Sequence, residues 1–332
     1  MPQPSIHLVN PLSIAFAGSE RRTLNYYRLL SGDADVTLWA ENEPDASLRQ
    51  YPTRRIDPAS ASIPHGGTLV LVGVYSERES WLALTKPERL IIVFNTPELN
   101  RLHRLLDFCV RSGLPRPEMI FCSETYRSWT GLPGFVDWGL YDFEKFKPAP
   151  PVRAPRSFTV GRLSRDEDYK HHPQDTRLYR MLVEKGMRVR LMGATAVRRR
   201  LERHDGIEGL ADGIEVLAVG SVAAHDFLHS LDAFIYRTDP AWREAAGRVV
   251  VEAMACGLPV VLGRSGGYRE LIDDGTNGFL FDTHRDALRC LDALRADPDF
   301  AQRVGAAARA TVVERFGRVH VERVREFFLR TD

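Results

Sequence analysis

Short apolar runs alternate with longer amphipathic stretches along almost the whole chain. The runs are four to eight residues long, rich in β-branched side chains and apolar at consecutive positions, which is typical of parallel strands covered on both faces. They lie at 6–9, 35–40, 68–75, 89–94, 118–122, 157–161, 188–193, 214–219, 233–236, 259–263 and 278–281. Helical stretches lie between many of them, at 20–30, 98–113, 173–186, 221–231, 247–257 and 286–297. This alternation predicts right-handed βαβ units and open parallel sheets.

One stretch breaks the alternation. EKFKPAPPVRAPRS, at 144–157, contains four prolines, which fit neither a helix interior nor a central strand. We interpret it as a linker between two domains, 1–147 and 156–318, followed by a helix at 319–332. The predicted fold class is α/β, with two tandem doubly wound, Rossmann-like parallel-sheet domains facing a cleft. Ligands of such sheets bind beyond the carboxyl ends of the strands.

The apolar helix expected at 247–256 contains one carboxylate, Glu252. A buried carboxylate without donors would cost several kcal/mol of folding free energy, about the effective cost of burying an ion. Two explanations are open. Glu252 forms an ion pair with Arg248, one turn earlier, or it accepts hydrogen bonds from the hydroxyls of a ligand such as a ribose.

A second carboxylate, Glu244, precedes this helix by eight residues. Eight residues make about 2.2 helical turns, so the two side chains would not share a face of one helix. We expect Glu244 in the loop before the helix, where Gly247 lets the backbone turn close to a ligand. The free N–H groups of the helix N-terminus would then face an anion. The pattern predicts a site for a phosphorylated, hydroxyl-rich molecule.

Four motifs in order now resemble one family. They are VGRLSRDEDYK at 160–170, LAVGSVAAHDFLHSLDAFIYRT at 217–238, the Glu244/Glu252 pair running into EAMACGLPVV, and GGYRELIDDGTNGFLF at 266–281. Together they resemble the donor site of retaining glycosyltransferases of the GT-B fold, the glycosyltransferase family four group. The resemblance implies transfer of a sugar from a nucleotide-diphosphate sugar to a glycan or lipid-linked acceptor, with retention of configuration. It also implies that the last helix crosses back to the first domain. We further expect the two domains to close on the donor about the linker at 144–157, because such a transfer needs water kept from the anomeric centre.

The resemblance also implies roles for single residues. Arg162 and Lys170 would reach the donor diphosphate, and Glu244 would hold a donor-sugar hydroxyl and stabilise positive charge at the anomeric carbon. The other implied donor-binding residues are Gly18, Gly193, Gly220, Gly247, Arg248, Val249, Glu252, Gly267 and Glu270.

Plainer alternatives stand beside these roles. Arg162 forms a surface ion pair with Asp166 or Glu167, Glu244 is a loop carboxylate in solvent, and 265–267 is a tight strand–helix turn. Glu270 lies in the first turn of a helix, where the helix dipole favours a carboxylate without any ligand.

The first half departs from the family pattern. Ala17–Gly18 stands where the family has two glycines, and Asn95 stands where a strand often ends in His. The Asn95 position leaves open a catalytically lapsed nucleotide-sugar-binding protein. A nucleotide-sugar epimerase of the same fold is a second alternative, although the Glu244/Glu252 pair argues against it. The aromatic segment 125–138 would face an acceptor or pack between the domains.

Composition narrows the class further. The net charge of +1 argues against nucleic acid as a partner. The four cysteines, Cys109, Cys122, Cys256 and Cys290, form no paired motif and indicate a reducing compartment. We see no signal peptide and no apolar run of about 20 residues, so we expect a cytoplasmic protein, with peripheral membrane contact if its acceptor is a lipid.

Metal chemistry is not expected. Metal-dependent transferases place Asp-x-Asp at the end of an apolar strand, whereas Asp33–Asp35 precedes a strand. His171–His172 has no further ligand set nearby and is interpreted as a solvated loop, and the basic stretch 198–203 as a solvated helix face. Neither dinucleotide nor P-loop glycine motifs occur. We therefore expect no cofactor.

Overall fold

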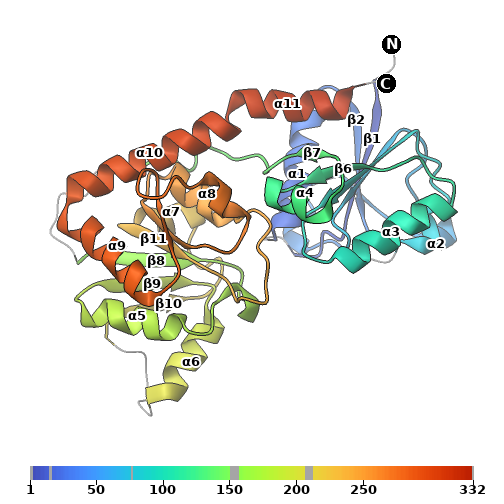
Figure 1. Cartoon of the computed structure of the whole chain (residues 1–332). Coiled ribbons are helices and arrows are strands. Elements are labelled where there is room, and N and C mark those ends of the chain that lie inside the picture. The colour runs from blue at the N-terminus through green and yellow to red at the C-terminus, as the bar shows by residue number, and fades with distance from the viewer. Residues whose placement is uncertain (1–2, 15–16, 76–77, 150–156, 206–211, 331–332) are drawn as a thin grey trace. The chain divides into compact units, whose positions relative to one another are not determined.

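The computed structural model describes residues 3–14, 17–75, 78–149, 157–205 and 212–330 (Figure 1). The chain divides into two compact units: Met1–Leu140 with Arg318–Asp332 (unit 1), and Tyr141–Gly317 (unit 2). Residues 141–147, which we expected in the first domain, therefore belong to unit 2. Phe146 is buried there, and its carbonyl accepts a hydrogen bond from Arg309. Of the expected linker, residues 150–156 lie outside the described residues.

Unit 1 is built on a seven-stranded parallel sheet of order β3-β2-β1-β4-β5-β6-β7. The strands are β1 (Ser5–Asn10), β2 (Asp35–Ala40), β3 (Thr53–Arg55), β4 (Thr68–Val72), β5 (Arg89–Phe94), β6 (Glu118–Phe121) and β7 (Phe135–Val136). The helices are α1 (Gly18–Leu30), α2 (Glu79–Leu82), α3 (Leu99–Arg111), α4 (Glu124–Thr130) and α11 (Arg318–Leu329), with 3₁₀ turns at Ala46–Leu48 and Pro58–Ser60.

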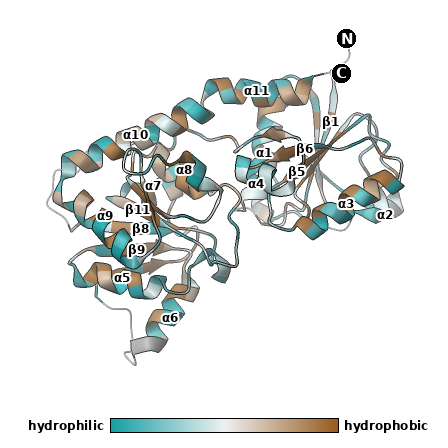
Figure 2. Ribbon diagram, viewed as in Figure 1, coloured by the Kyte–Doolittle hydropathy of each residue, from teal (hydrophilic) through white to brown (hydrophobic). Residues whose placement is uncertain are grey.

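One face of this sheet is covered by α1 and α11. Leu24 and Leu30 of α1, and Val324 and Phe328 of α11, share one core cluster with side chains of β1, β2, β4, β5 and β6. The last helix thus contributes apolar side chains to the core built by the first strands of the chain. Figure 2 shows the central strands in brown, as their continuous apolar runs require.

Unit 2 has a six-stranded parallel sheet of order β10-β9-β8-β11-β12-β13. The strands are β8 (Thr159–Leu163), β9 (Arg188–Met192), β10 (Ile214–Leu217), β11 (Ala233–Tyr236), β12 (Val260–Gly263) and β13 (Phe279–Phe281). The helices are α5 (Asp175–Glu184), α6 (Thr195–Asp205), α7 (Ala224–His229), α8 (Arg248–Ala255), α9 (His284–Ala296) and α10 (Pro298–Phe316), with 3₁₀ turns at Asp168–Lys170 (η3) and Gly267–Leu271 (η4).

Helices cover both faces of this sheet. The buried side chains of α5, α6 and α9 pack against one face in a single core cluster. On the other side, Phe227 of α7 lies under the Arg190 guanidinium of β9, and α8 packs against β11, β12 and α10. The prediction of two doubly wound parallel-sheet units is confirmed.

The apolar runs located most strands but not all. The two strands that the pattern missed, β3 and β7, are sheet edges of three and two residues, and β3 reads Thr-Arg-Arg. The run at 157–161 is displaced, because β8 begins at Thr159 and ends at Leu163. Segment 125–138 packs within unit 1, where Tyr126 and Trp129 contact Phe94. Over the described residues, no helix combines the length and apolarity needed to cross a bilayer.

Candidate functional site

The strand order of unit 2 reverses between β8 and β11. From β8 the chain adds β9 and β10 on one side, and then returns to add β11, β12 and β13 on the other. The loops that leave the C-terminal ends of β8 and β11 therefore run in opposite directions and open a crevice between them. Open α/β sheets bind their ligands in such a crevice. These two loops, 164–171 and 237–247, contain Lys170 and Glu244, and Arg162 lies in β8 just before the first of them.

Arg162 lies inside β8 and is fully buried, with 1% of its surface exposed. Its guanidinium donates to the backbone carbonyls of Arg237 (2.8 Å) and Lys170. It also lies 3.6 Å from the carboxylate of Asp175 and over the ring of Tyr236. The alternative that Arg162 forms a surface ion pair with Asp166 or Glu167 is wrong, because its side chain is buried and donates to backbone carbonyls. In this structure Arg162 holds the two loops together.

Lys170 and Glu244 form the centre of the site. The Lys170 ammonium donates to Oε2 of Glu244 at 2.6 Å, and the two side chains are only 10% and 13% exposed. The Tyr236 hydroxyl donates to the same carboxylate oxygen at 3.1 Å. The alternative that Glu244 is a solvated loop carboxylate is therefore wrong, since two donors from separate strand ends enclose it.

The site keeps Glu244 ionised. Burial alone would raise the pKa of this carboxyl, but the charge of Lys170 and the hydrogen bonds from Lys170 and Tyr236 outweigh burial and lower it below its usual value. Burial and the neighbouring Glu244 raise the pKa of Tyr236 well above its usual value, so its hydroxyl stays protonated and remains a donor.

Two aromatic rings cover the ammonium. Tyr169 and Trp242 pack with ring centroids 4.2 Å apart, and the Lys170 nitrogen lies 5.8 and 5.2 Å from the respective centroids. Such cation–π contacts are attractive and help to hold the ammonium between the rings and Glu244. The backbone N–H of Asp239 donates to the Tyr169 carbonyl at 3.1 Å, which ties the loops together.

Positive charge exceeds negative charge around the strand ends. Asp175, which is 2% exposed, accepts from Arg237 at 2.6 Å and lies near Arg162. Three buried cations, Arg162, Lys170 and Arg237, thus face two carboxylates, Asp175 and Glu244. Taken as formal charges this leaves an excess of one positive charge (3 − 2), and such a site attracts anions.

His171 is not solvated, contrary to expectation. It is fully buried, and its Nε2 lies 2.9 Å from the carbonyl of Gly193. Burial, followed by the charge of Arg162, lowers its pKa to about 3, so the ring is neutral near pH 7. Gly193 has φ 72°, and a Cβ there would lie 2.1 Å from the Ser164 carbonyl oxygen. Only glycine fits where the β8 and β9 loops touch.

Glu252 is buried in α8 at 3% exposure and forms an ion pair with Arg248, Nε to Oε1 2.9 Å. Of the two explanations for this carboxylate, the local ion pair is the one that the structure contains. Gly247 caps the helix with φ 77°, and a Cβ there would lie 2.7 Å from the ring of Tyr268. The expected sharp turn between Glu244 and the helix is present.

The remaining predicted residues are placed as follows. Gly267 is buried and donates its N–H to the Glu244 carbonyl at 2.9 Å, while Val249 is half-buried in α8. Glu270 lies on η4, a five-residue 3₁₀ helix rather than the α-helix we expected. Gly220 is exposed after β10. Gly18 is exposed at the first position of α1 and belongs to unit 1.

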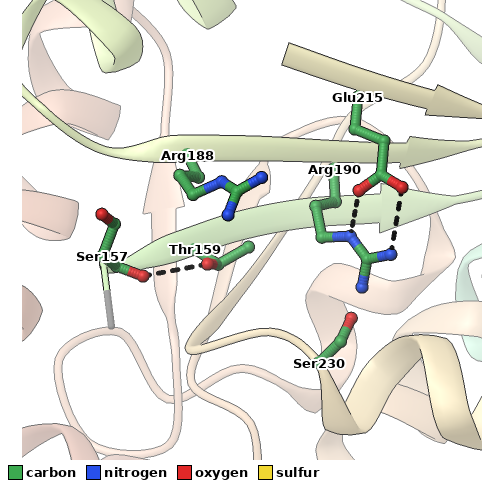
Figure 3. A pocket seen from close by; sticks show the side chains of 6 residues that line it. All are labelled: Ser157, Thr159, Arg188, Arg190, Glu215 and Ser230. Carbon is green, nitrogen blue, oxygen red and sulfur yellow. Dashed lines mark hydrogen bonds and ion pairs between the residues drawn. The ribbon is translucent and has the colours of Figure 1, made fainter. Parts of the chain in front are cut away.

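A pocket in unit 2 lies away from these residues. It is lined by Ser157, Thr159, Arg188, Arg190, Glu215 and Ser230 (Figure 3). The first four lie at or near the N-terminal ends of β8 and β9, whereas Arg162 lies near the C-terminal end of β8. Arg190 is also already paired with Glu215. We do not assign the functional site to this pocket. Among the described residues, no cluster of three or more His, Cys, Asp or Glu side chains could hold a metal ion.

Residues 141–311 match the family model of the group 1 glycosyl transferases. That segment comprises 171 residues (311 − 141 + 1) of 332, more than half of the chain. The chain belongs to this family.

Relatives of this group 1 glycosyl transferase include a D-inositol 3-phosphate glycosyltransferase of Streptomyces bingchenggensis, 41% identical over 80 residues, which are 24% of this chain and 17% of the relative. A sucrose synthase of Solanum tuberosum is 25% identical over 231 residues, 69% of this chain and 25% of that protein. The matched segments thus span a quarter or less of the length of either relative.

Solved structures resemble the group 1 glycosyl transferase over nearly its whole length. HepE of Anabaena in complex with UDP has a TM-score of 0.78 at 17% identity, covering 98% of this chain and 99% of that one. Sucrose-phosphate synthase of Thermosynechococcus elongatus has a TM-score of 0.71 at 15% identity, with coverage of 98% and 99%. With the two parallel sheets, these neighbours confirm the predicted GT-B fold.

Sequence reasoning missed several members of the site. Tyr236, Arg237 and Asp175 contact the predicted residues directly. A usable signal existed for Tyr236 and Arg237, because they end the strand next to β8 at the reversal point. Asp175 had no such signal, since an acidic residue at a helix start is common for dipole reasons alone.

Proposed function

We propose that this group 1 glycosyl transferase moves a sugar from a nucleotide-diphosphate sugar to a glycan or lipid-linked acceptor, with retention of configuration, as a family four enzyme. The observation that carries the proposal is the Lys170–Glu244 pair, 2.6 Å apart, at the strand reversal of the unit that the family model matches. HepE, a structural neighbour, has been crystallised with UDP and with UDP-glucose, which makes uridine nucleotides the first ligands to test.

The chemistry breaks the bond between the anomeric carbon and the diphosphate oxygen, and the electron pair leaves with the diphosphate. Lys170 would offset the charge that develops on that oxygen, supported by the excess positive charge of Arg162 and Arg237. Glu244 would accept a sugar hydroxyl and stabilise positive charge at the anomeric carbon. The acceptor oxygen then bonds on the same face, and its proton passes to the departing diphosphate oxygen.

Cations supplied by side chains make a metal ion unnecessary on this proposal. Gly193, Gly220 and Gly267 would allow backbone approach to the donor, and the α8 N-terminus after Gly247 would face its phosphates together with Arg248 and Val249. Glu252 and Glu270 would accept hydrogen bonds from hydroxyl groups of the nucleotide sugar.

We assign acceptor selection to unit 1. There Gly18 begins α1, and Asn95 at the end of β5 accepts a hydrogen bond from Tyr75 at 2.9 Å. A lipid-linked acceptor would bring the protein to the cytoplasmic face of a membrane.

The test is turnover with a panel of UDP-, GDP- and ADP-sugars, preceded by thermal-shift screening, since a ligand of the native state raises the melting temperature. Product configuration is read by proton NMR, and retention supports the proposal. Glu244→Gln should lower turnover about 10²–10³-fold, while Glu167→Gln, in the same region, should leave it near wild type. Epimerised free donor would instead indicate an epimerase. Binding with neither transfer nor donor hydrolysis would indicate a lapsed enzyme.

A further inference from the structure

Lys170 and Glu244 satisfy each other before any ligand arrives. Their charged atoms are 2.6 Å apart, and the side chains are about nine-tenths buried. A diphosphate that binds the Lys170 ammonium must therefore compete with a carboxylate for it. The inference that follows rests on the proposed function for the identity of that ligand, and on the structure for the competition.

The backbone holds the competitors close together. The Tyr169 carbonyl accepts the N–H of Asp239 at 3.1 Å, and the Glu244 carbonyl accepts the N–H of Gly267 at 2.9 Å. The Tyr169–Trp242 stack adds a third link between the two loops. The backbone of Glu244 is thus held next to the loop that contains Lys170, so its carboxylate can leave Lys170 only by changing its rotamer.

Few groups could replace Lys170 as a donor to Glu244. The titratable groups that face the carboxylate are Lys170, Arg165 and Tyr169 from the β8 loop, Tyr236 from β11 and Tyr268 from η4. Only Lys170 and Tyr236 donate to it directly among the hydrogen bonds of the described residues. If a phosphate binds the Lys170 ammonium instead, the buried carboxylate of Glu244 keeps only the neutral Tyr236 hydroxyl as a donor. That arrangement costs free energy, because a buried charge then lacks a counter-charge.

We propose that the Lys170–Glu244 pair makes the site prefer a nucleotide sugar over the nucleoside diphosphate that remains after transfer. While the sugar is bound, its hydroxyls donate to Glu244 and leave the Lys170 ammonium available to the diphosphate. Once the sugar has left, the Lys170–Glu244 ion pair forms again, and the diphosphate loses its contact with the Lys170 ammonium. The pair therefore promotes product release.

The experiment is titration calorimetry of the wild-type protein with UDP, GDP and ADP, continued with whichever of the three binds most tightly. Glu244→Gln should bind that nucleotide about tenfold more tightly than wild type, a difference of about 1.4 kcal/mol, because Lys170 no longer has an anionic partner. Glu167→Gln is the matched control. It removes one negative charge from the β8 loop but keeps the Glu167 carbonyl that accepts the Lys170 N–H at 2.9 Å. It should change affinity less than about twofold, as a partly exposed, screened charge does.

The pH dependence gives a second readout. Lys170 already holds the pKa of Glu244 below its usual value, against the effect of burial, so the carboxylate is ionised near neutral pH and begins to release Lys170 only in acid. The affinity gap between wild type and Glu244→Gln should narrow as the pH falls from 7 towards 4. Ionisation of the nucleotide affects both proteins equally and cancels in the comparison.

Equal or weaker binding by Glu244→Gln, or an equal gain in Glu167→Gln, would overturn the inference. If Glu244→Gln does not fold, Glu244→Asp decides, since it keeps the charge but withdraws the carboxylate by about 1.5 Å, one C–C bond. Tighter nucleotide binding by Glu244→Asp supports the exchange, and unchanged binding refutes it. Wild-type protein that binds none of the three nucleotides would refute the proposed function itself, a separate result.

Discussion

The guanidinium of Arg162 donates to the backbone carbonyl of Lys170, so the residue that precedes the first loop of the site also fixes where that loop ends. The same side chain reaches the carbonyl of Arg237 on the neighbouring strand at 2.8 Å. The planar guanidinium holds its N–H groups in a fixed fork, so one side chain can reach both carbonyls in this geometry.

Replacing Arg162 tests this bridging role. Arg162→Lys should lower the free energy of unfolding by roughly 2–4 kcal/mol, because a buried carbonyl is left without a donor and the ammonium cannot span both acceptors. Turnover should fall as well, since Lys170 is no longer held. Urea unfolding with parallel kinetics measures both. Arg177→Lys, on the exposed face of α5, is the control, and an equally mild effect of the two substitutions would contradict the role.

The second prediction separates the two explanations of Glu252. If it serves only the ion pair with Arg248, Glu252→Gln should lower the free energy of unfolding by about 1 kcal/mol. Arg248→Met should cost about 3–5 kcal/mol, because it leaves a buried carboxylate unpaired. The double variant should cost less than the sum of the two. If Glu252 also binds donor hydroxyls, Glu252→Gln should raise KM for the donor about tenfold, and it should do so in the Arg248→Met background as well as in wild type. Thermal unfolding measures the first effect, and donor titrations measure the second. An unchanged KM for Glu252→Gln would leave no ligand role for Glu252.

The third prediction concerns Asp137, which is fully buried in unit 1. It accepts from Arg22 at 2.6 Å, from the N–H of Gly139 at 2.7 Å and from His320 of α11 at 2.9 Å. Asp137→Asn should lower the free energy of unfolding by about 3–5 kcal/mol, the usual cost of removing one member of a buried ion pair. The exposed Asp107→Asn in α3 should cost less than about 0.5 kcal/mol.

The effect of Asp137 should depend on pH in a defined direction. Although burial opposes it, the charge of Arg22 and the hydrogen bond from His320 lower the pKa of Asp137 far below its usual value. Its stabilisation is therefore present above about pH 4, the unfolded pKa, and is lost as the pH falls towards the folded pKa. Wild type and Asp137→Asn should converge in stability in strong acid. A constant difference from pH 7 to pH 2 would show that the ionised form contributes nothing.

The fourth prediction uses His171. Its folded pKa, lowered by burial to about 3, lies below the unfolded value of about 6.5. The unfolded chain therefore binds a proton that the folded protein does not, and stability falls as the pH drops from 6.5 to 3, by up to about 1.4 kcal/mol per pH unit. His171→Gln should remove this part of the acid sensitivity, while the exposed His103→Gln in α3 should not. Identical acid titrations of wild type and His171→Gln would contradict the assignment.

The fifth prediction is that transfer survives excess chelator. Side-chain cations around the Lys170–Glu244 pair supply the charge that a metal would otherwise bring. Transfer rates measured in EDTA, and again after adding magnesium or manganese, should agree within about twofold. A metal ion that took part in catalysis would contribute several kcal/mol, so its removal would lower the rate by far more than that. Activity lost in EDTA and restored by either ion would show that the side chains alone do not suffice.

The strands were predictable where apolar runs were continuous. Runs 35–40, 89–94 and 233–236 coincide with β2, β5 and β11 to the residue, because strands buried on both faces carry no polar alternation. The edge strand β3 could not be found this way, since its Arg54 and Arg55 face solvent.

The sequence predicted several residues of the site, but it did not predict which of them contact one another. Lys170 and Glu244 are 74 positions apart, and no local pattern says that one will meet the other. Arg162 was expected to face a ligand or solvent because arginine is seldom fully buried, yet its place among the apolar residues of β8 pointed inwards. His171 was misjudged for a similar reason: its pairing with a carbonyl after β9 depends on how two loops meet.

The contribution of α11 to the core of unit 1 has a consequence for synthesis on the ribosome. Val324 and Phe328 lie in the same cluster as Ile6 and Leu8 of β1, so the first strand to emerge must wait for a helix made some 300 residues later. Unit 2 is contiguous in the chain and has all of its own elements by Gly317. The second unit can therefore complete its core while the first is still unfinished, the reverse of the usual N-terminal-first order. A released chain truncated after Gly317 should have a protease-resistant second half joined to a protease-sensitive first half.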